Sequence, residues 1–335
     1  MTPRIVAATP TAIHEAAQRL RAGELVAFPT ETVYGLGAHA LDRDAVARIF
    51  AAKGRPAWNP VIVHVADVEA ARALVTHWPT AAERLATTSW PGPLTLVLPR
   101  APHVPDAVTG GTDTVAVRIP SHPVALALLR EADVPIAAPS ANRFTQLSPT
   151  RAEHVAAALG DRVELILDGG PCEVGIESTV VDCTGATPLI LRTGLLDAAT
   201  LAARLGAPVE VAKRRVVADD TQRASPGMVE RHYAPRAEVW LATSADRTEI
   251  DAALRTRRLT TPTARVGAIA RGNGWAPDGA DLVERLPDEP AGYARGLYAA
   301  LHAFDDAGCA IVVVDAPPAD GPWAGVHDRL TRATR

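Results

Sequence analysis

The sequence predicts an α/β protein built on a twisted, mixed parallel/antiparallel sheet with helices, followed by a smaller C-terminal α/β domain. Short apolar runs of strand length alternate with amphipathic segments of helix length. Several neighbouring runs have no helix between them, which favours a mixed sheet over a purely parallel one. The chain is 47% hydrophobic but only 4% aromatic, as expected for an α/β core of Ala, Val, Leu and Ile.

In the first part of the chain, the spacing of apolar residues predicts the helices and strands, and capping residues and glycines mark where they begin and end. Thr9 or Thr11 can cap the first helix, and Asp42 or Asp44 can cap the second, which Gly54 ends. Helices are expected at 10–21, 45–52, 68–75, 81–88, 124–131 and 198–205, with a further helix capped at Thr150. Strands are expected at 25–28, 61–65, 94–98, 114–119, 134–138, 165–168, 180–182 and 189–192.

The chain divides into a first unit, 1–206, a connecting segment, 207–238, and a second α/β unit, 239–335. The connecting segment has little periodicity and is longer than an ordinary connection, so it is a disordered linker or a functional loop. Its bulky residues, among them Tyr233, favour a functional loop. In the second unit we expect strands at 239–242, 266–270 and 310–314, and a helix at 291–307 with one apolar face.

The stretch 28–60 organises the first unit. The apolar run 25–28 is followed by hydroxyls, a carboxylate and glycines, which we expect to form a loop rather than more strand. The following helix returns Lys53 and Arg55 towards that loop, and two cations beside hydroxyl groups indicate an anionic ligand such as a phosphate ester. Lys53 and Lys213 are the only lysines; a GC-rich genome would explain this, as would a site that needs a compact ammonium group.

Several classes of protein are disfavoured by composition and motifs. The net charge of −4 argues against a free-standing nucleic-acid binder. Three cysteines without a CxxC pair fit a reducing compartment, and no apolar run approaches the roughly 20 residues of a membrane helix, so we expect a soluble, cytoplasmic protein. There is no GxxxxGK[ST], GxSxG or HExxH motif, and ten scattered histidines do not predict a metal site.

What remains is a set of polar groups near strand ends, which we expect to converge on one face of the sheet. His64 and Arg118 could each also be ordinary core or surface residues, and Thr114 alone would be a surface strand residue. Ser140 precedes Ala-Asn rather than forming an elbow, so it is predicted to bind a ligand, not to attack one. The set comprises Thr32, Lys53, Arg55, Asn59, His64, Arg118, Ser140, Asn142, Ser148, Ser178 and Arg192.

The motifs resemble those of a known family. The segments are 29–37 (PTETVYGLG), 53–56 (KGRP), 59–60 (NP), 139–142 (PSAN), 148–150 (SPT) and 225–235 (SPGMVERHYAP). Together they are similar to the YrdC-like L-threonylcarbamoyladenylate synthases of the long, two-domain type. The resemblance implies a YrdC-like catalytic domain, a linker that acts as a lid, and a Rossmann-like C-terminal domain. It also implies that L-threonine, bicarbonate and ATP are converted to threonylcarbamoyl-AMP and pyrophosphate, for threonylcarbamoyladenosine modification of tRNA.

The resemblance also implies roles for individual residues. Lys53 and Arg55 would be catalytic, with Lys53 on phosphate or carbamate, and Tyr233 would fold over the nucleotide. Threonine would be held by Thr32, His64, Arg118, Ala138 and Ser178. ATP would be held by Arg55, Asn59, Thr114, Ser140, Asn142, Ser148, Arg192 and Tyr233.

The expected partners follow from the same resemblance. Mg²⁺ would be carried by ATP with few protein ligands, since no carboxylate cluster is evident. The product would pass to a downstream tRNA threonylcarbamoyl transferase complex, with no stable direct tRNA binding and no membrane association. The family often has Ser-Gly soon after Ser-Ala-Asn, whereas Phe144 and Thr145 stand here, so the contacts of this loop are expected to differ.

Two other functions fit the sequence less well. A non-catalytic RNA-binding protein is disfavoured by the acidic charge balance and by the lack of interleaved aromatic and basic residues. An enzyme that transfers carbamoyl groups to a protein thiol, as in hydrogenase maturation factors with YrdC-like domains, would need further zinc-finger and acylphosphatase-like segments. Three cysteines are too few for those.

Overall fold

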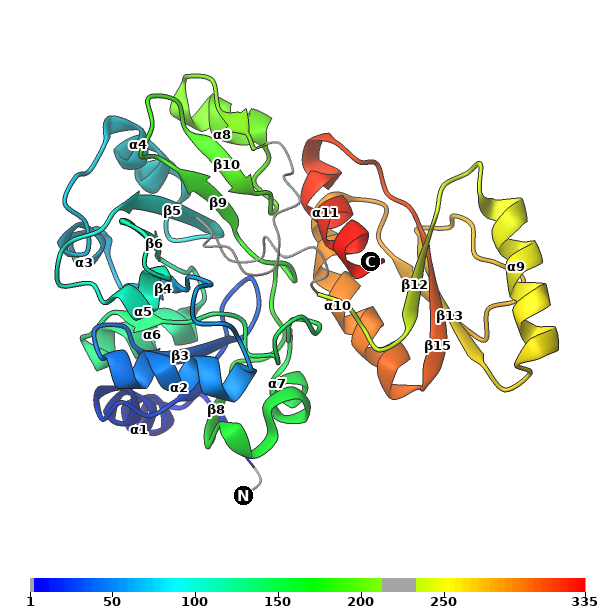
Figure 1. Ribbon diagram of the computed structural model, residues 1–335, viewed down its shortest axis with the longest axis horizontal. Helices are drawn as coiled ribbons and strands as arrows, with labels where there is room; N and C mark the ends of the chain where they lie inside the picture. The colour runs from blue at the N-terminus through cyan, green and yellow to red at the C-terminus, as the bar shows by residue number, and fades with distance from the viewer. Residues whose placement is uncertain (1–2, 213–232, 335) are drawn as a thin grey trace.

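A computed structural model describes residues 3–212 and 233–334, which form two sheets with their own helices (Figure 1). Among the described residues, the larger sheet has 11 strands in the order β1-β8-β2-β3-β7-β4-β6-β5-β9-β10-β11. These are β1 Arg4–Ala7, β2 Val26–Phe28, β3 Gly35–His39, β4 Ile62–His64, β5 Leu94–Pro99, β6 Thr114–Arg118, β7 Ile136–Ala137, β8 Leu165–Asp168, β9 Thr179–Asp182, β10 Leu189–Arg192 and β11 Glu210–Val211. Parallel pairs such as β4 with β6 and antiparallel pairs such as β2 with β3 both occur, so the predicted mixed sheet is confirmed.

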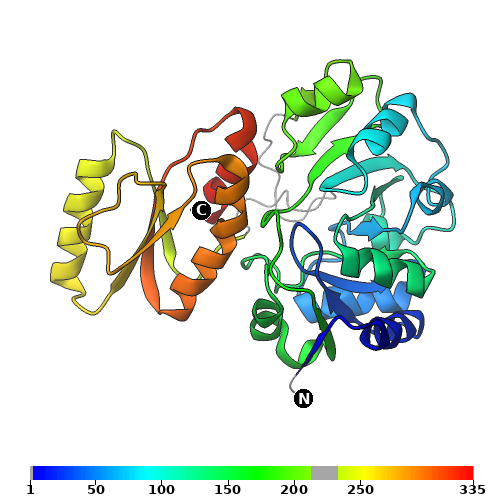
Figure 2. The ribbon, with the colours of Figure 1, turned by 180° about the vertical axis from the view of Figure 1, so that it is seen from behind.

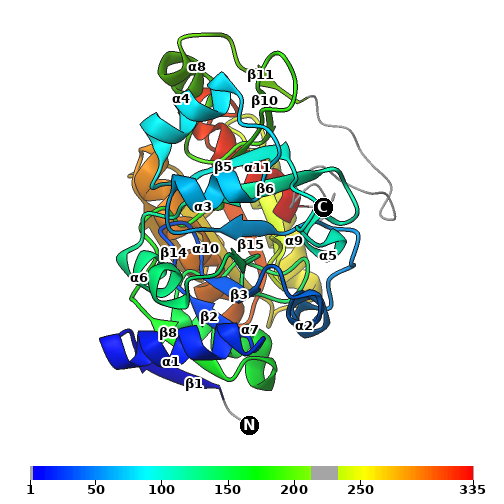
Figure 3. The same cartoon turned by 90° about the vertical axis from the view of Figure 1, so that its left-hand side faces the viewer.

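Helices cover both faces of the larger sheet. α1 and α6 pack on one face, while α2 and α7 pack on the other, and Figure 3 shows α6 and α2 on opposite sides of the strands. α4 and α8 share a third apolar cluster with β5, β9 and β10. The helices are α1 Pro10–Arg21, α2 Arg43–Lys53, α3 Val68–Ala73, α4 Thr80–Ser89, α5 Asp106–Thr109, α6 Pro123–Ala132, α7 Ala152–Leu159 and α8 Ala198–Leu205, with a 3-10 turn at Gly160–Arg162.

The helix α2 begins and ends at the predicted signals. The Asp42 carboxylate accepts hydrogen bonds from the backbone N–H groups of Asp44 (2.9 Å) and Ala45 (3.2 Å). Gly54 follows the last helical residue with a φ of +62°, the left-handed conformation that glycine adopts without strain. Because both ends of the helix are fixed, the positions of Lys53 and Arg55 at its C-terminal end are fixed too.

The prediction that a loop continues from Phe28 to the second helix is wrong. Gly35–His39 is the strand β3, which turns back to pair antiparallel with β2. Glycine is required within it because an added Cβ at Gly37 would lie 2.8 Å from the Phe28 ring and 3.0 Å from Ile136. Close packing, rather than a turn, explains this glycine.

The smaller sheet has the order β12-β15-β13-β14 among the described residues, and every pair in it is parallel. Its strands are β12 Glu238–Ala242, β13 Arg265–Arg271, β14 Leu282–Leu286 and β15 Cys309–Asp315, and its helices are α9 Arg247–Thr260, α10 Pro290–Asp306 and α11 Ala324–Ala333, with a 3-10 turn at Gly321–Trp323. The predicted apolar face of the long helix is buried at Tyr293, Leu297, Leu301 and Phe304. α10 and α11 lie on the side of this sheet that faces the larger one, and α9 lies on the far side (Figures 1 and 2).

The two sheets share one apolar cluster. Val33, Leu147 and Ile176 from the first part pack with residues of α10, α11 and the smaller sheet. Tyr233 lies in the same cluster, with 2% of its surface exposed. The predicted boundaries 1–206, 207–238 and 239–335 stay predictions, since most of the middle segment, including the SPGM motif, lies outside the described residues.

Two further observations concern the whole described chain. No helix within 3–212 or 233–334 is long and apolar enough to span a bilayer. Cys172, Cys183 and Cys309 are buried and carry free thiols.

Candidate active site

A cavity opens between the β2–β3 turn, the ends of β4, β6 and β7, and the segment 177–178 beside β10. The structure brings most of the predicted site residues to this cavity from positions far apart in the sequence. Those that line it are Thr32, Arg55, His64, Arg118, Ala138, Ser140, Ser178, Arg192 and Tyr233. Convergence of polar groups at strand ends was the central sequence prediction, and the fold produces it for these residues.

His64 and Arg118 are neighbours because β4 and β6 pair in parallel with these two residues in register. Burial, reinforced by the charge of Arg118, lowers the pKa of His64 to about 3, so the imidazole is neutral at physiological pH. Its Nδ1 is buried and lacks a hydrogen-bond partner among the described residues. A neutral, unpartnered ring nitrogen at a cavity wall is suited to a hydrogen bond with a ligand.

Arg118 is held from three sides. Its Nε donates to the carbonyl of Gly92 (3.3 Å), and Nη1 donates to the Thr32 hydroxyl (2.9 Å). Its Nη2 lies 2.7 Å from Glu31 Oε1, an ion pair whose atoms are not aligned as a hydrogen bond, with both side chains almost fully buried. The guanidinium is therefore fixed in direction and retains N–H groups for a carboxylate.

The β2–β3 turn contributes Thr30 and Thr32 to the lining of the cavity. The hydroxyl of Thr30 donates to the carbonyl of Val33 (2.6 Å) and accepts from the N–H groups of Thr32 and Val33. It also lies 2.8 Å from the Thr32 hydroxyl. This turn places Thr32 where it meets Arg118.

Ser178 and Arg192 line the cavity next to each other. Arg192 Nε donates to the backbone carbonyl of Ser178, and Nη2 donates to the Ser178 hydroxyl, each at a distance of 3.1 Å. The Ser178 hydroxyl also lies 2.8 Å from that of Thr95 on β5. A buried arginine and a hydroxyl thus line the same cavity as Arg118 and Thr32.

Arg55 and Lys53 are both buried next to the cavity, but only Arg55 lines it. Arg55 donates to Asn59 Oδ1 (2.6 Å) and to the Pro60 carbonyl (2.8 Å), and burial lowers its pKa to about 10. The Lys53 ammonium donates to the carbonyls of Ser140 (2.6 Å) and Asn142. Burial, followed by the charge of Arg55, holds the pKa of Lys53 well below its usual value.

The remaining predicted residues do not line the cavity. Asn59 holds Arg55, and the backbone carbonyl of Asn142 holds Lys53. The Ser148 hydroxyl donates to Glu177 Oε1 (2.5 Å). Thr114 begins β6 and has its hydroxyl near that of Thr112 (3.3 Å). The roles predicted for these residues in binding ATP stay predictions.

The loop after Asn142 contains Phe144 and Thr145, where the resembling family often has Ser-Gly. Thr145 has a φ of +69°, the left-handed region that favours the glycine frequent in the resembling family. Its carbonyl accepts a hydrogen bond from the N–H of Ala234, which follows Tyr233. The Phe144 ring lies 6.0 Å from the Arg55 guanidinium, a contact that a serine could not make.

Sequence reasoning missed three residues of this site. Thr30 and Glu177 line the cavity, and Glu31 anchors Arg118 from behind it. Thr30 and Glu31 lie inside the quoted PTET motif, and Glu177 directly precedes Ser178. Adjacency to a predicted residue was the available signal. The partners that give Glu31 and Glu177 a role, Arg118 and Arg329, lie far along the chain, whereas Thr30 acts within its own turn.

Comparisons with known proteins match both parts of the chain. A family described as "Telomere recombination", which includes the Sua5, YciO and YrdC proteins, matches residues 18–194. The family described as "Threonylcarbamoyl-AMP synthase, C-terminal domain" matches residues 196–334.

Individual relatives extend over almost the whole chain. The threonylcarbamoyl-AMP synthase of Pyrococcus abyssi (strain GE5 / Orsay) is 43% identical over 327 residues, which cover 96% of this chain and 94% of that protein. That of Bacillus subtilis (strain 168) is 42% identical over 330 residues, covering 96% and 92%. The crystal structure of P. abyssi Sua5 complexed with L-threonine superposes with a TM-score of 0.87 at 43% identity, covering 96% and 94%.

These relatives are synthases, so the comparisons agree with the enzyme prediction and lend no support to a non-catalytic RNA-binding protein. The fold and the order of its motifs agree with the same assignment. The chain therefore belongs to the threonylcarbamoyl-AMP synthase (L-threonylcarbamoyladenylate synthase) family, in its two-domain form.

Proposed function

We propose that this protein joins L-threonine, bicarbonate and ATP to give threonylcarbamoyl-AMP and pyrophosphate. One observation carries the proposal. A single cavity is lined by Arg118, Thr32, His64 and Ser178, suited to an amino acid, and by Arg55 and Arg192, suited to a nucleotide and its phosphates. Family membership and the L-threonine complex of P. abyssi Sua5 support the same substrate.

On the amino-acid side, Arg118 binds the threonine carboxylate through N–H groups aimed by Glu31, Thr32 and Gly92. His64 stays neutral and contributes a hydrogen bond without adding positive charge. The free amine of threonine attacks the carbon of bicarbonate, and loss of one water gives the carbamate. Fixing both reactants in one cavity removes the entropic cost of their encounter.

On the nucleotide side, a carbamate oxygen attacks the α-phosphorus of ATP and the bond to pyrophosphate breaks. Both reactants are anionic, so cations are needed to bring them together and to stabilise the charge that develops. Arg55 and Arg192 line the cavity and would serve there. Lys53 would act next to them, where its ammonium group is held by the carbonyls of Ser140 and Asn142.

The described residues at the cavity offer few free carboxylates for Mg²⁺. Of the carboxylates at the cavity, Glu177 is bound by Arg329 and Ser148, and Glu31 is paired with Arg118. Within 3–212 and 233–334, no group of three or more His, Cys, Asp or Glu side chains could hold a metal. We therefore propose that Mg²⁺ arrives bound to the triphosphate of ATP.

Further partners follow from the product and stay proposals. The labile adenylate would pass to a tRNA threonylcarbamoyl transferase complex, and the synthase itself would not hold tRNA stably. Tyr233, buried at the cavity wall, remains the predicted cover of the nucleotide. A cytoplasmic location stays a prediction from cysteine usage.

The decisive experiment is detection of the product by mass spectrometry. Purified protein is incubated with ATP, bicarbonate and L-threonine, and parallel reactions lack bicarbonate or contain L-serine instead. We expect a species with the mass of threonylcarbamoyl-AMP, with equimolar pyrophosphate, only in the complete reaction. Pyrophosphate release that is indifferent to threonine, or no adenylate at all, would overturn the proposal.

A further inference from the structure

The wall of the cavity that carries Ser178 and Arg192 is in direct contact with the C-terminal domain. An added Cβ at Gly175 would lie 2.4 Å from the carbonyl of Ala294 on α10. An added Cβ at Gly325 on α11 would lie 2.3 Å from the carbonyl of Gly194. Backbone therefore meets backbone at both places, which leaves little freedom between α10, α11 and this wall.

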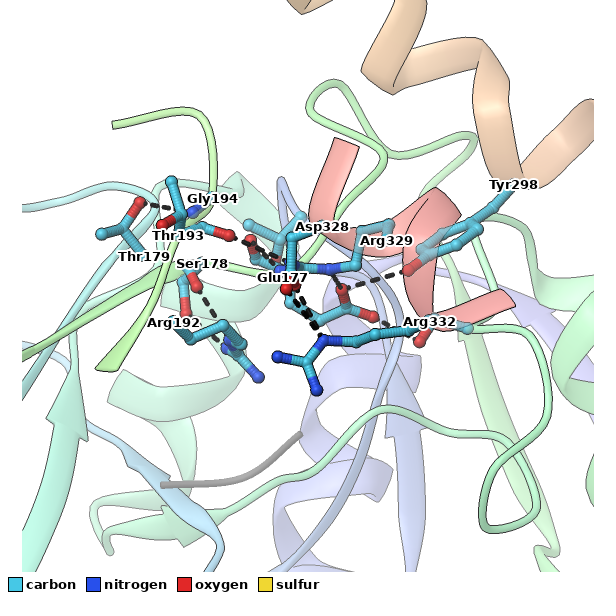
Figure 4. A network of polar contacts seen from close by, with 12 residues as sticks. Glu177, Ser178, Thr179, Arg192, Thr193, Gly194, Tyr298, Asp328, Arg329 and Arg332 are labelled. Carbon is cyan, nitrogen blue, oxygen red and sulfur yellow. Dashed lines mark hydrogen bonds and ion pairs between the residues drawn. The ribbon is translucent and has the colours of Figure 1, made fainter. Parts of the chain in front are cut away.

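Glu177 of the first domain forms an ion pair and hydrogen bonds with side chains of the C-terminal domain. Its Oε2 accepts from Arg329 Nε on α11 (2.6 Å) and from the Tyr298 hydroxyl on α10 (3.2 Å), as Figure 4 shows. Its Oε1 accepts from the hydroxyl of Ser148 (2.5 Å). Burial by itself would raise the pKa of Glu177, but the charges of Arg329 and Arg192 outweigh it and lower this pKa. The carboxylate is thus ionised and fully engaged.

Arg329 contacts both segments of the wall at once. Its side chain is 0% exposed, and it donates to the carbonyl of Thr193 through Nη1 (3.0 Å) and to that of Glu177 through Nη2 (3.4 Å). Asp328 also pairs with it at 2.8 Å. Ser178 follows Glu177 in the chain, and Arg192 precedes Thr193, so one guanidinium binds the immediate neighbours of two residues that line the cavity (Figure 4).

We propose that Arg329 is a positioning residue of the active site: by binding Glu177 and Thr193, it makes the C-terminal domain fix the cavity-lining residues Ser178 and Arg192 in their binding positions. This inference rests on the proposed function and assigns a role to the C-terminal domain within it. It requires no contact between Arg329 and a substrate. The carboxylate of Glu177, which interacts with both Arg192 and Arg329, also offsets the repulsion between these two cations.

The test compares Arg329→Met and Glu177→Gln, singly and together, in the full chain. We expect each single change to raise the KM for threonine and for ATP about tenfold, with a smaller effect on kcat, because binding geometry is disturbed in ground state and transition state alike. The double variant should be no worse than the more impaired single variant, since both changes disrupt one unit. Arg329→Lys, which keeps a charge but cannot reach both partners, should fall between Arg329→Met and the wild type.

The matched control is Arg295→Met. Arg295 lies on α10 and also crosses to the first domain, but it donates to the carbonyl of Glu173 (2.8 Å), away from Glu177. We expect its KM values to stay within about twofold of the wild type. An equal rise in the control would show that general domain docking, not Arg329, controls the wall.

Calorimetric titration of threonine and ATP separates this inference from the proposed function. If the wild type binds both but makes no adenylate, the proposed function fails while the binding test still reports on Arg329. If Arg329→Met merely melts at a lower temperature and keeps both affinities and KM values within twofold, the positioning role is refuted. If Arg329→Met does not fold, Arg329→Lys is decisive by the same criterion.

Discussion

His64 makes the stability of this protein sensitive to mild acid. The unfolded chain takes up a proton on this ring near pH 6.5, whereas the folded protein holds the pKa at about 3, because of burial and then the charge of Arg118. Stability from the neutral ring is therefore fully present above about pH 6.5 and is lost as the pH falls towards 3. Linkage between these two pKa values gives a loss of about 2 kcal/mol in the free energy of unfolding near pH 5.

The measurement compares urea unfolding of the wild type and His64→Gln near pH 7.5 and near pH 5. Other histidines, including the stacked pair His154 and His302, are present in both proteins, so the difference isolates His64. We expect the wild type to lose about 2 kcal/mol more than the variant over this range. Equal losses in the two proteins, or a ring that titrates near pH 6.5 in the folded protein by NMR, would refute the reasoning.

Three other substitutions probe the site. Lys53→Ala should abolish threonine-dependent pyrophosphate release, a loss of about 100-fold or more, because a buried cation beside the reacting anions is removed; turnover within about twofold of the wild type counts against its role. Glu31→Gln should raise the KM for threonine about fivefold, because Arg118 loses the carboxylate that aims it, whereas a lower KM would mean that net charge outweighs alignment. Gly194→Ala should lower the free energy of unfolding by about 2 kcal/mol and the melting temperature by several degrees, since the added Cβ would lie 2.6 Å from the Glu177 carbonyl. The control is Gly185→Ala, whose added Cβ would have its nearest neighbour 3.7 Å away. Equal melting temperatures for the two variants would contradict this prediction.

Local signals in the sequence predicted the elements that periodicity and capping define. The helix α2, between Asp42 and Gly54, and the buried face of α10 are examples, since each depends on residues within one or two turns. The strand β3 was missed because its two glycines and polar preceding turn resemble a loop, and only close packing against Phe28, Ile136 and Ala138 on neighbouring segments explains the glycines. α9, α11, β1 and β14 were not predicted; α9 and β14 expose most of one side and have a weak apolar pattern.

The site was predictable only as far as residue types and order could suggest it. His64, Arg118, Ser178 and Arg192 were expected together, and the sheet brings them to one cavity. Glu177 was not expected, because its partner Arg329 is 152 residues further along the chain. Contacts between domains leave no periodic trace in a single sequence, so the contribution of α11 to this wall required the structure.

The pairing of β4 with β6 constrains how this chain can change in length. His64 and Arg118 share the cavity face, and Val63 and Val117 share the opposite face, which belongs to an aliphatic cluster, because Ile62 is opposite Ala116. A single residue inserted in one strand would exchange the two sides, sending an arginine or a histidine into an aliphatic core and a valine into the cavity. Viable insertions and deletions in this part of the protein should therefore occur outside the two strands, however far they extend the segments on either side.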